Sequence, residues 1–578
     1  MYVCTMYSKN WIVKSAPDTA VVERLMEVLG VDAILAKLLA QREVCDFANA
    51  KAFFRPAYEH LLDPFLMKDM QRAVDRIIHA IRYRENIMVY GDYDVDGTTS
   101  VAMVYSFLKK IYPYVDYYIP DRYTEGYGVS YKGIDVAVAG DFRLIISLDC
   151  GTKAVDKIKY ANSKGVDFIV CDHHYPGTEL PPAFALLNPK RADCNYPYKE
   201  LSGCGVGFKM LQAFAQKNGM PPEDVYEYID LVAVSIASDI VPMNGENRIL
   251  TALGIQKLNE NPGLGLKSII KISGLEGTKH QVDDIVFKIG PRINAAGRMK
   301  SGKYAVELLI SDEERTAKTA GVEIDRFNTD RKNVDSDITC QALRMLAADP
   351  EQEYRKTTVL FNPSWHKGVV GIVASRLIET YYRPTVILTE SNGLATGSAR
   401  SVEGFDLYKA IDACSDLLEN FGGHMFAAGI TMKTENVEAF KRRFDDVVAE
   451  TITDEQLVPN ILIDTQIDFT DINPKFVRIL KQFQPFGPKN MSPVFLTRNV
   501  LDTGSAKIVG KYGEHLKLDL RQTDHPDIFF PAIGFQLGDH YPIIRSGKPF
   551  DICYAIEENT FRGETKIQLQ VKGIRNND

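Results

Sequence analysis

The sequence lacks the features of several protein classes. No window of its 578 residues approaches the ~18 consecutive apolar residues of a membrane span, and there is no fixed-period repeat or low-complexity tract. The composition, 45% hydrophobic and 25% charged, is typical of globular proteins. Membrane-spanning and disordered classes are therefore excluded. At roughly 100–200 residues per domain, the length predicts three or four domains.

Paired cysteines and a basic excess are also missing. The nine cysteines are scattered along the chain without the close pairs of a zinc ribbon or redox motif, so we interpret them as reduced structural thiols. The start, Met1 to Trp11, has no basic flank, long apolar stretch or small-residue cleavage site, which predicts a cytoplasmic protein. Lys and Arg total 68 against 76 Asp and Glu, a net charge of -8. An anionic ligand must then be held by a local basic cleft or by metal ions.

The order of apolar runs predicts an α/β fold. Runs at 87–90, 144–148 and 168–171 each precede a polar cluster and a helical pattern, as in parallel strands joined by helices. The charged stretch from 312 to about 347 has no proline and one glycine, and it predicts a bridging helix of about 50 Å. Two surface helices broken near Gly321 are the alternative. A second α/β pattern and a β-rich barrel follow. The predicted parts are a helical N-terminal lobe, an α/β lobe, a connecting helix, a second α/β lobe and a barrel, at 1–75, 76–311, 312–348, 349–457 and 458–578.

Three carboxylates follow the first predicted strand. Asp92, Asp94 and Asp96 occupy alternate positions directly after the run 87–90. Because close like charges repel one another, such a loop normally needs a cation. An EF-hand is not supported, because no glutamate stands at the twelfth position of the loop. The loop predicts a metal site, with an exposed acidic turn as the alternative.

Further acids and histidines follow the next elements. Asp149 ends the run 144–148, the triplet Asp172-His173-His174 ends the run 168–171, and Asp239 ends an apolar helix. The carboxyl ends of parallel strands meet at one edge of a sheet, so these groups should converge. A lone histidine there is more often structural, but the triplet is harder to explain that way. Carboxylates with one or two imidazoles suit Mn²⁺ or Mg²⁺ better than structural zinc. Two such ions about 3.5–4 Å apart hydrolyse phosphoesters.

These four motifs, in this order and spacing, resemble those of the DHH phosphoesterase superfamily. Within it the chain is similar to the RecJ single-strand-specific 5′ to 3′ DNA exonucleases, over roughly residues 75–575. Other segments carry the same resemblance: Pro120-Asp121-Arg122, Glu125-Gly126-Tyr127-Gly128, Gly290 to Arg298, Trp365-His366, Gly397 to Ser401, and Gly422-Gly423-His424.

The resemblance implies a two-metal site. Carried onto this chain, one ion is held by Asp94 and Asp149, and the other by Asp96, Asp149, His173 and Asp239. Asp92 completes the first site, because Tyr90 stands where small pyrophosphatase-like members have a histidine. His174 and Asp172 then lie behind the ligands or contact phosphate.

The resemblance also implies a substrate site. Arg122, Ser398 and Arg400 match positions suited to the 5′-terminal phosphate, with an intramolecular salt bridge as the alternative. Arg292, Asn294 and Arg298 could touch the DNA backbone. His424 resembles a substrate-contacting motif of the DHH-associated domain, with a buried structural histidine as the alternative. Candidate stacking residues on the barrel, most of them more typical of core, are Phe483, Phe486, Phe529, Phe530 and Phe535.

The implied architecture is two α/β lobes, DHH and DHH-associated, joined by a long helix around a central groove, with a C-terminal OB-like β-barrel. The implied activity is metal-dependent 5′ to 3′ degradation of single-stranded DNA to nucleoside 5′-monophosphates in recombination and repair. Single-strand binding protein and a RecQ-type helicase are the implied partners. The turn 485–493 departs from the family, with Lys489 in place of Gly and Met491 in place of Pro, which bears on the turn more than on catalysis.

Two alternatives stay open from the sequence. The first is a DHH-type phosphodiesterase of short oligonucleotides or cyclic dinucleotides, which the length and the barrel do not favour. The second is a non-enzymatic scaffold that binds single strands. That reading does not predict the Asp or His found at every proposed ligand position.

Overall fold

The computed structural model describes residues 9–561 and 564–577. Cys4 and Met1 to Ser8, on which part of the expectation about export rested, lie outside the described residues. The chain divides into two compact units. The first unit comprises Asp46–Arg331 with Gln482–Met491, and the second comprises the N-terminal part up to Cys45, Lys332–Lys481 and the chain from Ser492.

A five-stranded parallel sheet forms the centre of the first unit, in the order β3-β2-β4-β5-β6. All three predicted runs are strands of this sheet, and their apolar residues are buried on both faces, as in parallel sheets covered by helices. The strand order changes direction between β2 and β4, which is where such sheets bind ligands. The strands are β2 (Asn86–Gly91), β3 (Val115–Tyr118), β4 (Phe142–Leu148), β5 (Asp167–Cys171) and β6 (Ala185–Leu187).

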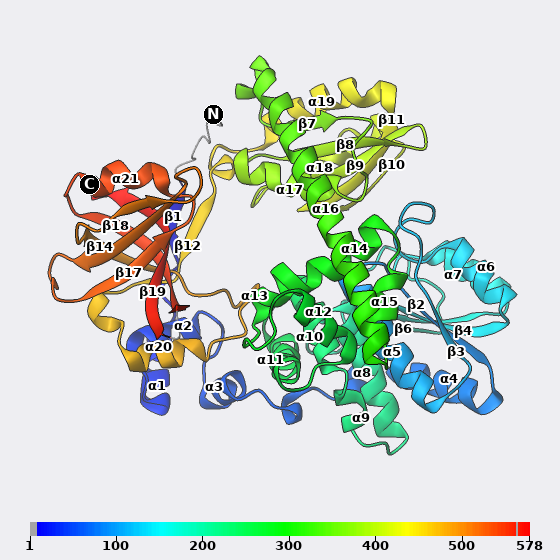
Figure 1. Ribbon diagram of the computed structural model, residues 1–578. Helices are drawn as coiled ribbons and strands as arrows, with labels where there is room; N and C mark the ends of the chain where they lie inside the picture. The colour runs from blue at the N-terminus through cyan, green and yellow to red at the C-terminus, as the bar shows by residue number, and fades with distance from the viewer. Residues whose placement is uncertain (1–8, 562–563, 578) are drawn as a thin grey trace. The chain divides into compact units, whose positions relative to one another are not determined.

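Helices cover both faces of this sheet (Figure 1). Ile87, Ile146 and Ile169 face a large core made with α4, α5 and α8, whereas Ile145 and Phe168 face a smaller core made with α6 and α7. These helices are α4 (Met70–Tyr83), α5 (Val95–Ile111), α6 (Tyr131–Ala139), α7 (Val155–Ser163) and α8 (Gly203–Lys217). The remaining helices of the first unit are α3 (Phe47–Phe54), α9 (Glu223–Tyr226), α10 (Ile229–Ser238), α11 (Gly245–Glu260), α12 (Leu264–Ile272), α13 (Val282–Asp284), α14 (Gly290–Met299) and α15 (Lys303–Leu309).

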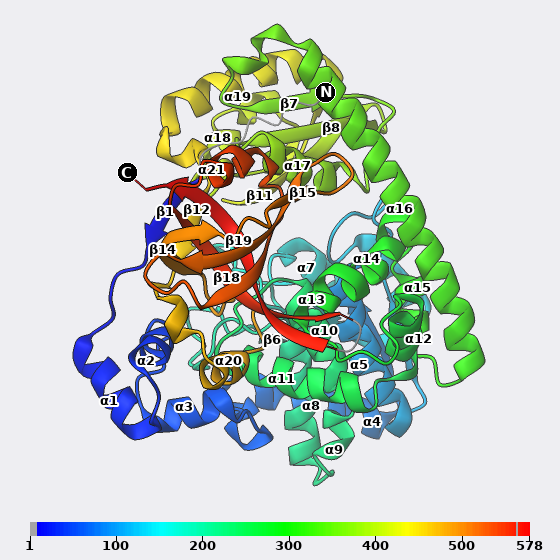
Figure 2. The same ribbon diagram turned by 60° about the vertical axis from the view of Figure 1, so that its left-hand side comes forward.

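The predicted connecting helix is a single element. Helix α16 (Glu314–Ala348) runs for 35 residues without a break (Figure 2). Gly321 does not interrupt it, so the alternative of two broken helices is wrong. A Cβ added at Gly321 would lie 2.2 Å from Ser268 Oγ on α12, so glycine permits the close approach of these two helices. The helix begins in the first unit and ends in the second.

The second unit contains another α/β sheet, of mixed direction, in the order β10-β11-β9-β8-β7. Strands β7 and β8 are parallel, and the other neighbours are antiparallel. The elements are β7 (Thr358–Phe361), α17 (Val370–Thr380), β8 (Thr385–Ser391), β9 (Leu394–Arg400), α18 (Leu407–Asp412), β10 (Asn420–His424), β11 (Ala427–Lys433) and α19 (Val437–Thr451).

The predicted barrel is also present. Five strands pair in the series β14-β18-β19-β17-β16, and an additional pairing of β14 with β16 closes the ring. The strands of this sheet are β13 (Thr465–Gln466), β14 (Phe495–Asp502), β15 (Lys507–Val509), β16 (His515–Gln522), β17 (Phe529–Gly534), β18 (Phe550–Phe561) and β19 (Glu564–Asn576). The helices that flank these strands in the sequence are α20 (Pro474–Lys481) and α21 (Tyr541–Arg545).

The first 75 residues, predicted as a helical lobe, contribute to both units. In the second unit, β1 (Asn10–Val13) pairs in parallel with β12 (Asn460–Ile463), and helices α1 (Thr19–Leu29) and α2 (Ala33–Ala40) follow. Gln41 Nε2 donates to Asp464 O at 2.9 Å. Within the described part of the chain, every helix is too short or too polar to span a bilayer.

Candidate functional site

The predicted acidic and histidine motifs converge at the carboxyl edge of the first sheet. Asp92 follows β2, Asp149 follows β4 and His173 follows β5, and these three strands are direct neighbours. Asp239 joins them as the C-cap of α10. Two groups hold potential ligand atoms within 4.8 Å of one another, namely Asp149, His173 and His174, and Asp96, His173 and Asp239.

The first motif is shaped by the start of a helix. Asp94 caps α5, and its Oδ1 accepts a hydrogen bond of 3.0 Å from Gly97 N. A Cβ added at Gly97 would lie 2.4 Å from Asp92 O, so only glycine fits this tight turn. Asp149, the first residue after β4, adopts φ 58°, a left-handed conformation that aspartate tolerates better than most residues.

Asp96 is held by three hydrogen bonds. Its Oδ2 accepts from Gly203 N at 2.7 Å, and its Oδ1 accepts from Cys204 N at 2.8 Å, both in the first turn of α8. Ser235 Oγ on α10 donates to the same Oδ1 at 2.6 Å. The amino end of α8 is thus a donor for a buried anion, as expected from helix geometry.

His173 faces three carboxylates. Its Nε2 lies 3.2 Å from Asp149 Oδ1, 3.6 Å from Asp239 Oδ2 and 3.7 Å from Asp96 Oδ2. Burial lowers the pKa of His173 to about 3, with the nearby His174 charge adding to the effect. A neutral imidazole among carboxylates is a metal-ligand arrangement.

His174 has a different environment. Its Nδ1 lies 2.7 Å from Asp172 Oδ1, and Thr152 N donates to Asp172 Oδ2 at 2.8 Å. Burial opposes the shift, but the Asp172 carboxylate raises the pKa of His174 to about 9. Tyr127 OH lies 3.2 Å from His174 Nε2 and donates to Asp149 O at 3.2 Å. Without a bound metal ion, His174 is therefore a cation at neutral pH.

Without a cation, the buried carboxylates of the site repel one another, which makes their ionised forms unfavourable. Burial is the main cause that raises the pKa values of Asp92 and Asp96, and the charge of the neighbouring Asp94 is the second. The pKa of Asp92 lies well above its ordinary value, and that of Asp96 is about 6. Burial, and next the charge of Asp96, raise the pKa of Asp149 and of Asp239. Asp92 Oδ2 is buried and has no hydrogen-bond partner among the described residues. Oxygen-rich donors with one neutral imidazole fit Mn²⁺ or Mg²⁺.

Four of the predicted substrate residues lie in the first unit. Arg122 stacks over the Tyr93 ring at 4.3 Å, and no ion pair of its guanidinium occurs among the described residues, so the salt-bridge alternative is not supported. Arg292 does have such a pair, with Asp325 at 2.9 Å. It shares α14 with Asn294 and Arg298.

The other three lie in the second unit, on two strands that are separated by β11. Ser398 and Arg400 are on β9, and Ala427 of β11 pairs with both Arg400 and His424. A Cβ added at Gly371, in the first turn of α17, would lie 3.1 Å from Arg400 Nη2 and from Ser398 Oγ. Burial lowers the pKa of Arg400, and within the described ranges it forms no salt bridge. A helix start, a hydroxyl and a guanidinium without a salt bridge are the kinds of donor that bind anions.

Side-chain exposure separates the remaining candidates. His424 is exposed, so a buried structural histidine is wrong here. Phe529 and Phe535 expose 61% and 53% of their surfaces, as base stacking requires. Phe483 is fully buried and packs edge-on against Phe53 at 5.4 Å, so it belongs to the core of the first unit. Phe486 and Phe530 are half-buried.

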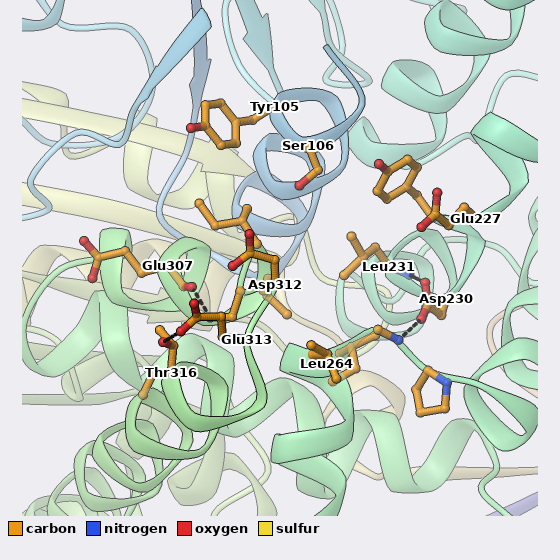
Figure 3. Close-up of a pocket in the computed structure, with 18 of the residues that line it drawn as sticks. Tyr105, Ser106, Glu227, Asp230, Leu231, Leu264, Glu307, Asp312, Glu313 and Thr316 are labelled. Carbon is orange, nitrogen blue, oxygen red and sulfur yellow. Dashed lines mark hydrogen bonds between the residues drawn. The ribbon is translucent and has the colours of Figure 1, made fainter. Parts of the chain in front are cut away.

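A cavity of about 1290 Å³ lies away from these residues (Figure 3). Tyr105 of α5 and Asp230 of α10 line it, and Asp230 Oδ2 accepts from Gly263 N at 2.9 Å. Its walls mix acidic and basic side chains, and no predicted site residue lines it. The carboxyl half of α5 and the amino end of α10 thus face this cavity, whereas their other ends carry Asp96 and Asp239.

Three contributors were missed from the sequence: Ser235, Tyr127 and the amino end of α8. Tyr127 lies in a segment that carried the resemblance, and Ser235 lies in the apolar helix that Asp239 ends, but no role was assigned to either. The signal for the third was the glycine-rich stretch 202–207, with a serine cap before an apolar helix. Its partner could not be identified, because Asp96 is more than 100 residues away in sequence.

Comparison with known proteins identifies three domain families in the chain. The DHH family N-terminal domain matches residues 86–236, the DHHA1 domain matches 354–450 and the RecJ OB domain matches 463–573. The single-stranded-DNA-specific exonuclease RecJ of Bacillus subtilis is 37% identical over 560 residues, which cover 96% of this chain and 70% of that protein.

Solved structures give the same result. RecJ from Thermus thermophilus in complex with Mn²⁺ has a TM-score of 0.84 and 27% identity, covering 98% of this chain and 80% of that one. The Mg²⁺ complex from the same organism has a TM-score of 0.78 and 26% identity, covering 98% and 79%. By its three domains and its resemblance along almost the whole length, the chain belongs to the RecJ family of single-stranded-DNA-specific exonucleases.

Proposed function

We propose that this protein degrades single-stranded DNA from a 5′-phosphorylated end, with two divalent ions, Mn²⁺ or Mg²⁺, and releases nucleoside 5′-monophosphates. The observation that carries the proposal is the cluster of carboxylates around His173 at the carboxyl edge of the first sheet. Membership in a family named for single-strand-specific exonucleases supports the choice of substrate.

The proposed ligands divide into two sets that share Asp149. Asp92, Asp94 and Asp149 would hold one ion, and Asp96, Asp149, His173 and Asp239 the other. The raised pKa values of four of these carboxyls and the unpartnered Asp92 Oδ2 support this assignment, since a cation would offset the repulsion. When bound, two such ions lower the pKa of water and stabilise the charge that develops on a phosphoryl group.

Other side chains of the first unit would position the substrate. The pKa of His174, about 9, makes it a cation at neutral pH, and its Nε2–H would have to leave Tyr127 OH to donate to a phosphate oxygen. Arg122, fixed over Tyr93, offers a planar fork of donors for the same purpose. Arg298 and Asn294, on α14, are proposed backbone contacts, and Arg292 would have to leave Asp325 to join them.

The second unit would supply selectivity for the 5′ end. Ser398 Oγ, the Arg400 guanidinium and the start of α17 surround one small space and offer donors that match a terminal phosphate. His424 lies on β10, across β11 from Arg400, and would contact the same nucleotide. The barrel, with Phe529 and Phe535 exposed, would hold the strand by base stacking.

The wider role follows from the substrate. Single strands with 5′ ends arise in recombination and repair, so we infer that the enzyme acts there, in the cytoplasm. Single-strand binding protein and a RecQ-type helicase stay predicted partners.

The test is digestion of a 5′-phosphorylated, 3′-labelled ~40-mer single strand with Mn²⁺, beside its blunt duplex and a 5′-labelled copy. We expect immediate release of labelled mononucleotide from the 5′-labelled strand, and resistance of the duplex. Cleavage confined to very short oligomers, or none with any metal, would contradict the proposal.

A further inference from the structure

We propose that the segment Gln482–Met491 braces the loop that follows Asp239, and that Arg248 and Asn490 are positioning residues for this metal ligand. The inference rests on the proposed role of Asp239 in the metal site. It assigns a function to the turn at which this chain departs from the family.

Asp239 is the most exposed of the carboxylates that face His173. Its side chain exposes 29% of its surface, against 2% for Asp149 and 0% for Asp96. Three hydrogen bonds fix Asp96, whereas Asp239 caps a helix and faces His173 Nε2 at 3.6 Å. Asp239 N donates to Ser235 O at 2.9 Å, so α10 fixes the backbone before the carboxylate, and the loop 240–244 fixes the backbone after it.

That backbone is strained. Ile240 adopts φ 58° and is 64% exposed. A β-branched residue in the left-handed region is a steric outlier, and such strain persists only where the surrounding structure fixes it. Little holds the exposed Ile240 side chain itself, so the constraint must come from the following residues.

Those residues are fixed from two sides. Pro242 O accepts hydrogen bonds from Tyr198 OH at 3.2 Å and from Asn247 Nδ2 at 3.0 Å. On the other side, Met243 N donates to Pro488 O at 2.7 Å. Met243 is buried, and a Cβ added at Gly487 would lie 3.0 Å from Met243 Cβ, so this glycine lets the segment lie directly on the loop.

The segment is itself firmly held. The Arg248 guanidinium, buried on α11, donates to the carbonyls of Phe53, Gln482, Phe483, Gln484 and Pro485, at distances of 2.8–3.3 Å. Asn490 Nδ2 donates to Phe483 O at 2.9 Å and to Pro485 O at 2.8 Å, which closes the turn. Lys489, at the family's glycine position, adopts φ 66°, so the turn keeps its left-handed residue despite the substitution.

The placement of this segment in the chain makes the brace more than local packing. Its ten residues belong to the first unit, although the residues before and after them belong to the second. Arg248 lies five residues after Met243. One short stretch of chain therefore carries the proposed ligand Asp239, the loop that follows it, and the arginine that holds the segment Gln482–Met491.

The test compares Arg248→Lys and Asn490→Ala with a matched control, Arg76→Lys, on the full-length protein. Arg76 is a buried arginine of the same unit that donates to Asp167 Oδ2 at 2.7 Å and to Arg143 O at 3.2 Å, away from the loop. Mn²⁺ binding is titrated by electron paramagnetic resonance, the 240–244 amides are followed by hydrogen exchange, and melting is followed by circular dichroism. Asp239→Asn shows how much Mn²⁺ affinity is lost when this ligand is removed completely.

We expect Arg248→Lys and Asn490→Ala to weaken Mn²⁺ binding at one site about tenfold, the lower end of the effect of supporting residues on metal affinity. The backbone amides of residues 240–244 should exchange faster. The KM for DNA should be unchanged, and kcat should recover when the Mn²⁺ concentration is raised. Arg76→Lys should change melting alone.

Unchanged Mn²⁺ affinity and unchanged exchange of 240–244 in both variants would overturn the proposal and leave a purely structural turn. If Arg248→Lys does not fold, Asn490→Ala decides. Wild-type protein that binds Mn²⁺ but degrades no DNA would contradict the proposed function, and the binding and exchange data would still decide whether the brace exists.

Discussion

The hydrogen bond from Ser235 to Asp96 gives the sharpest prediction. Ser235 Oγ is fully buried and donates to Asp96 Oδ1 at 2.6 Å, while Gly203 N and Cys204 N supply the other two donors. A hydrogen bond to a charged group contributes about 1.5–3 kcal/mol. It stabilises the ionised carboxylate, whose pKa burial and the Asp94 charge already raise to about 6. Ser235→Ala should raise that pKa further, by about one to two pH units at 1.36 kcal/mol per unit.

The assay is Mn²⁺ affinity measured across pH 5 to 8. A cation must displace the proton from Asp96, so affinity falls on the acid side of the carboxyl pKa. In Ser235→Ala the pH at which affinity falls should move up by about one to two units, and affinity at pH 7 should drop about two- to tenfold. At pH 8.5 or above, much of the difference should disappear, because the carboxyl is then ionised in both proteins.

Ser238 provides the matched control. It lies on the same helix, three residues further on, and its hydroxyl is buried without a hydrogen-bond partner among the described residues. Ser238→Ala makes the same chemical change without touching Asp96 and should leave the pH profile in place. Equal profiles for Ser235→Ala and the wild type, or equal shifts in both variants, would refute the reasoning.

Three further predictions concern the site. Asp149→Asn should lower kcat at least about 10³-fold, since the metal contribution is several kcal/mol and the variant removes the ligand shared by both ions; full activity in DNA digestion would reject the two-ion assignment. Arg400→Lys should reduce the preference for 5′-phosphate over 5′-hydroxyl ends about tenfold, because lysine cannot offer a planar fork, and an unchanged ratio of kcat/KM values would exclude this role. In metal-free protein the pKa of the Asp96 carboxyl is about 6 in the folded state and 3.8 in the unfolded chain. Between pH 3.8 and 6 the folded protein therefore holds a proton that the unfolded chain has lost. The free energy of unfolding should therefore fall by up to about 3 kcal/mol as pH rises from 4 to 7, relative to Asp96→Asn, in urea titrations with a chelator, and a rise would contradict it.

The fold was largely predictable because its signals are local. The apolar runs before Asp92, Asp149 and Asp172 are parallel strands buried on both faces, and such strands read as continuous apolar stretches. Convergence of the acids followed from one general rule, that the carboxyl ends of parallel strands meet at one edge. The long α16 was predictable from its charged, proline-free stretch.

Contacts between distant segments were not predictable. The three donors to Asp96 come from α8 and α10, more than 100 residues away, and nothing in their local sequence names their acceptor. Phe483 is an aromatic residue of the kind that stacks on bases, but it packs against Phe53 in the core of the first unit. Arg292 looked free to bind DNA, yet Asp325 of α16 occupies it.

The sequence by itself determined the strands, the long helix, the barrel and the identity of the acidic and histidine groups at the site, because each depends on residue order within one element. Only the tertiary structure decided which groups are neutral and which are charged: His173 is buried among carboxylates, whereas His174 is paired with Asp172. It also placed Pro488 on Met243, beside the strained Ile240. Burial and distance set these properties, and both arise only when segments remote in the chain pack together.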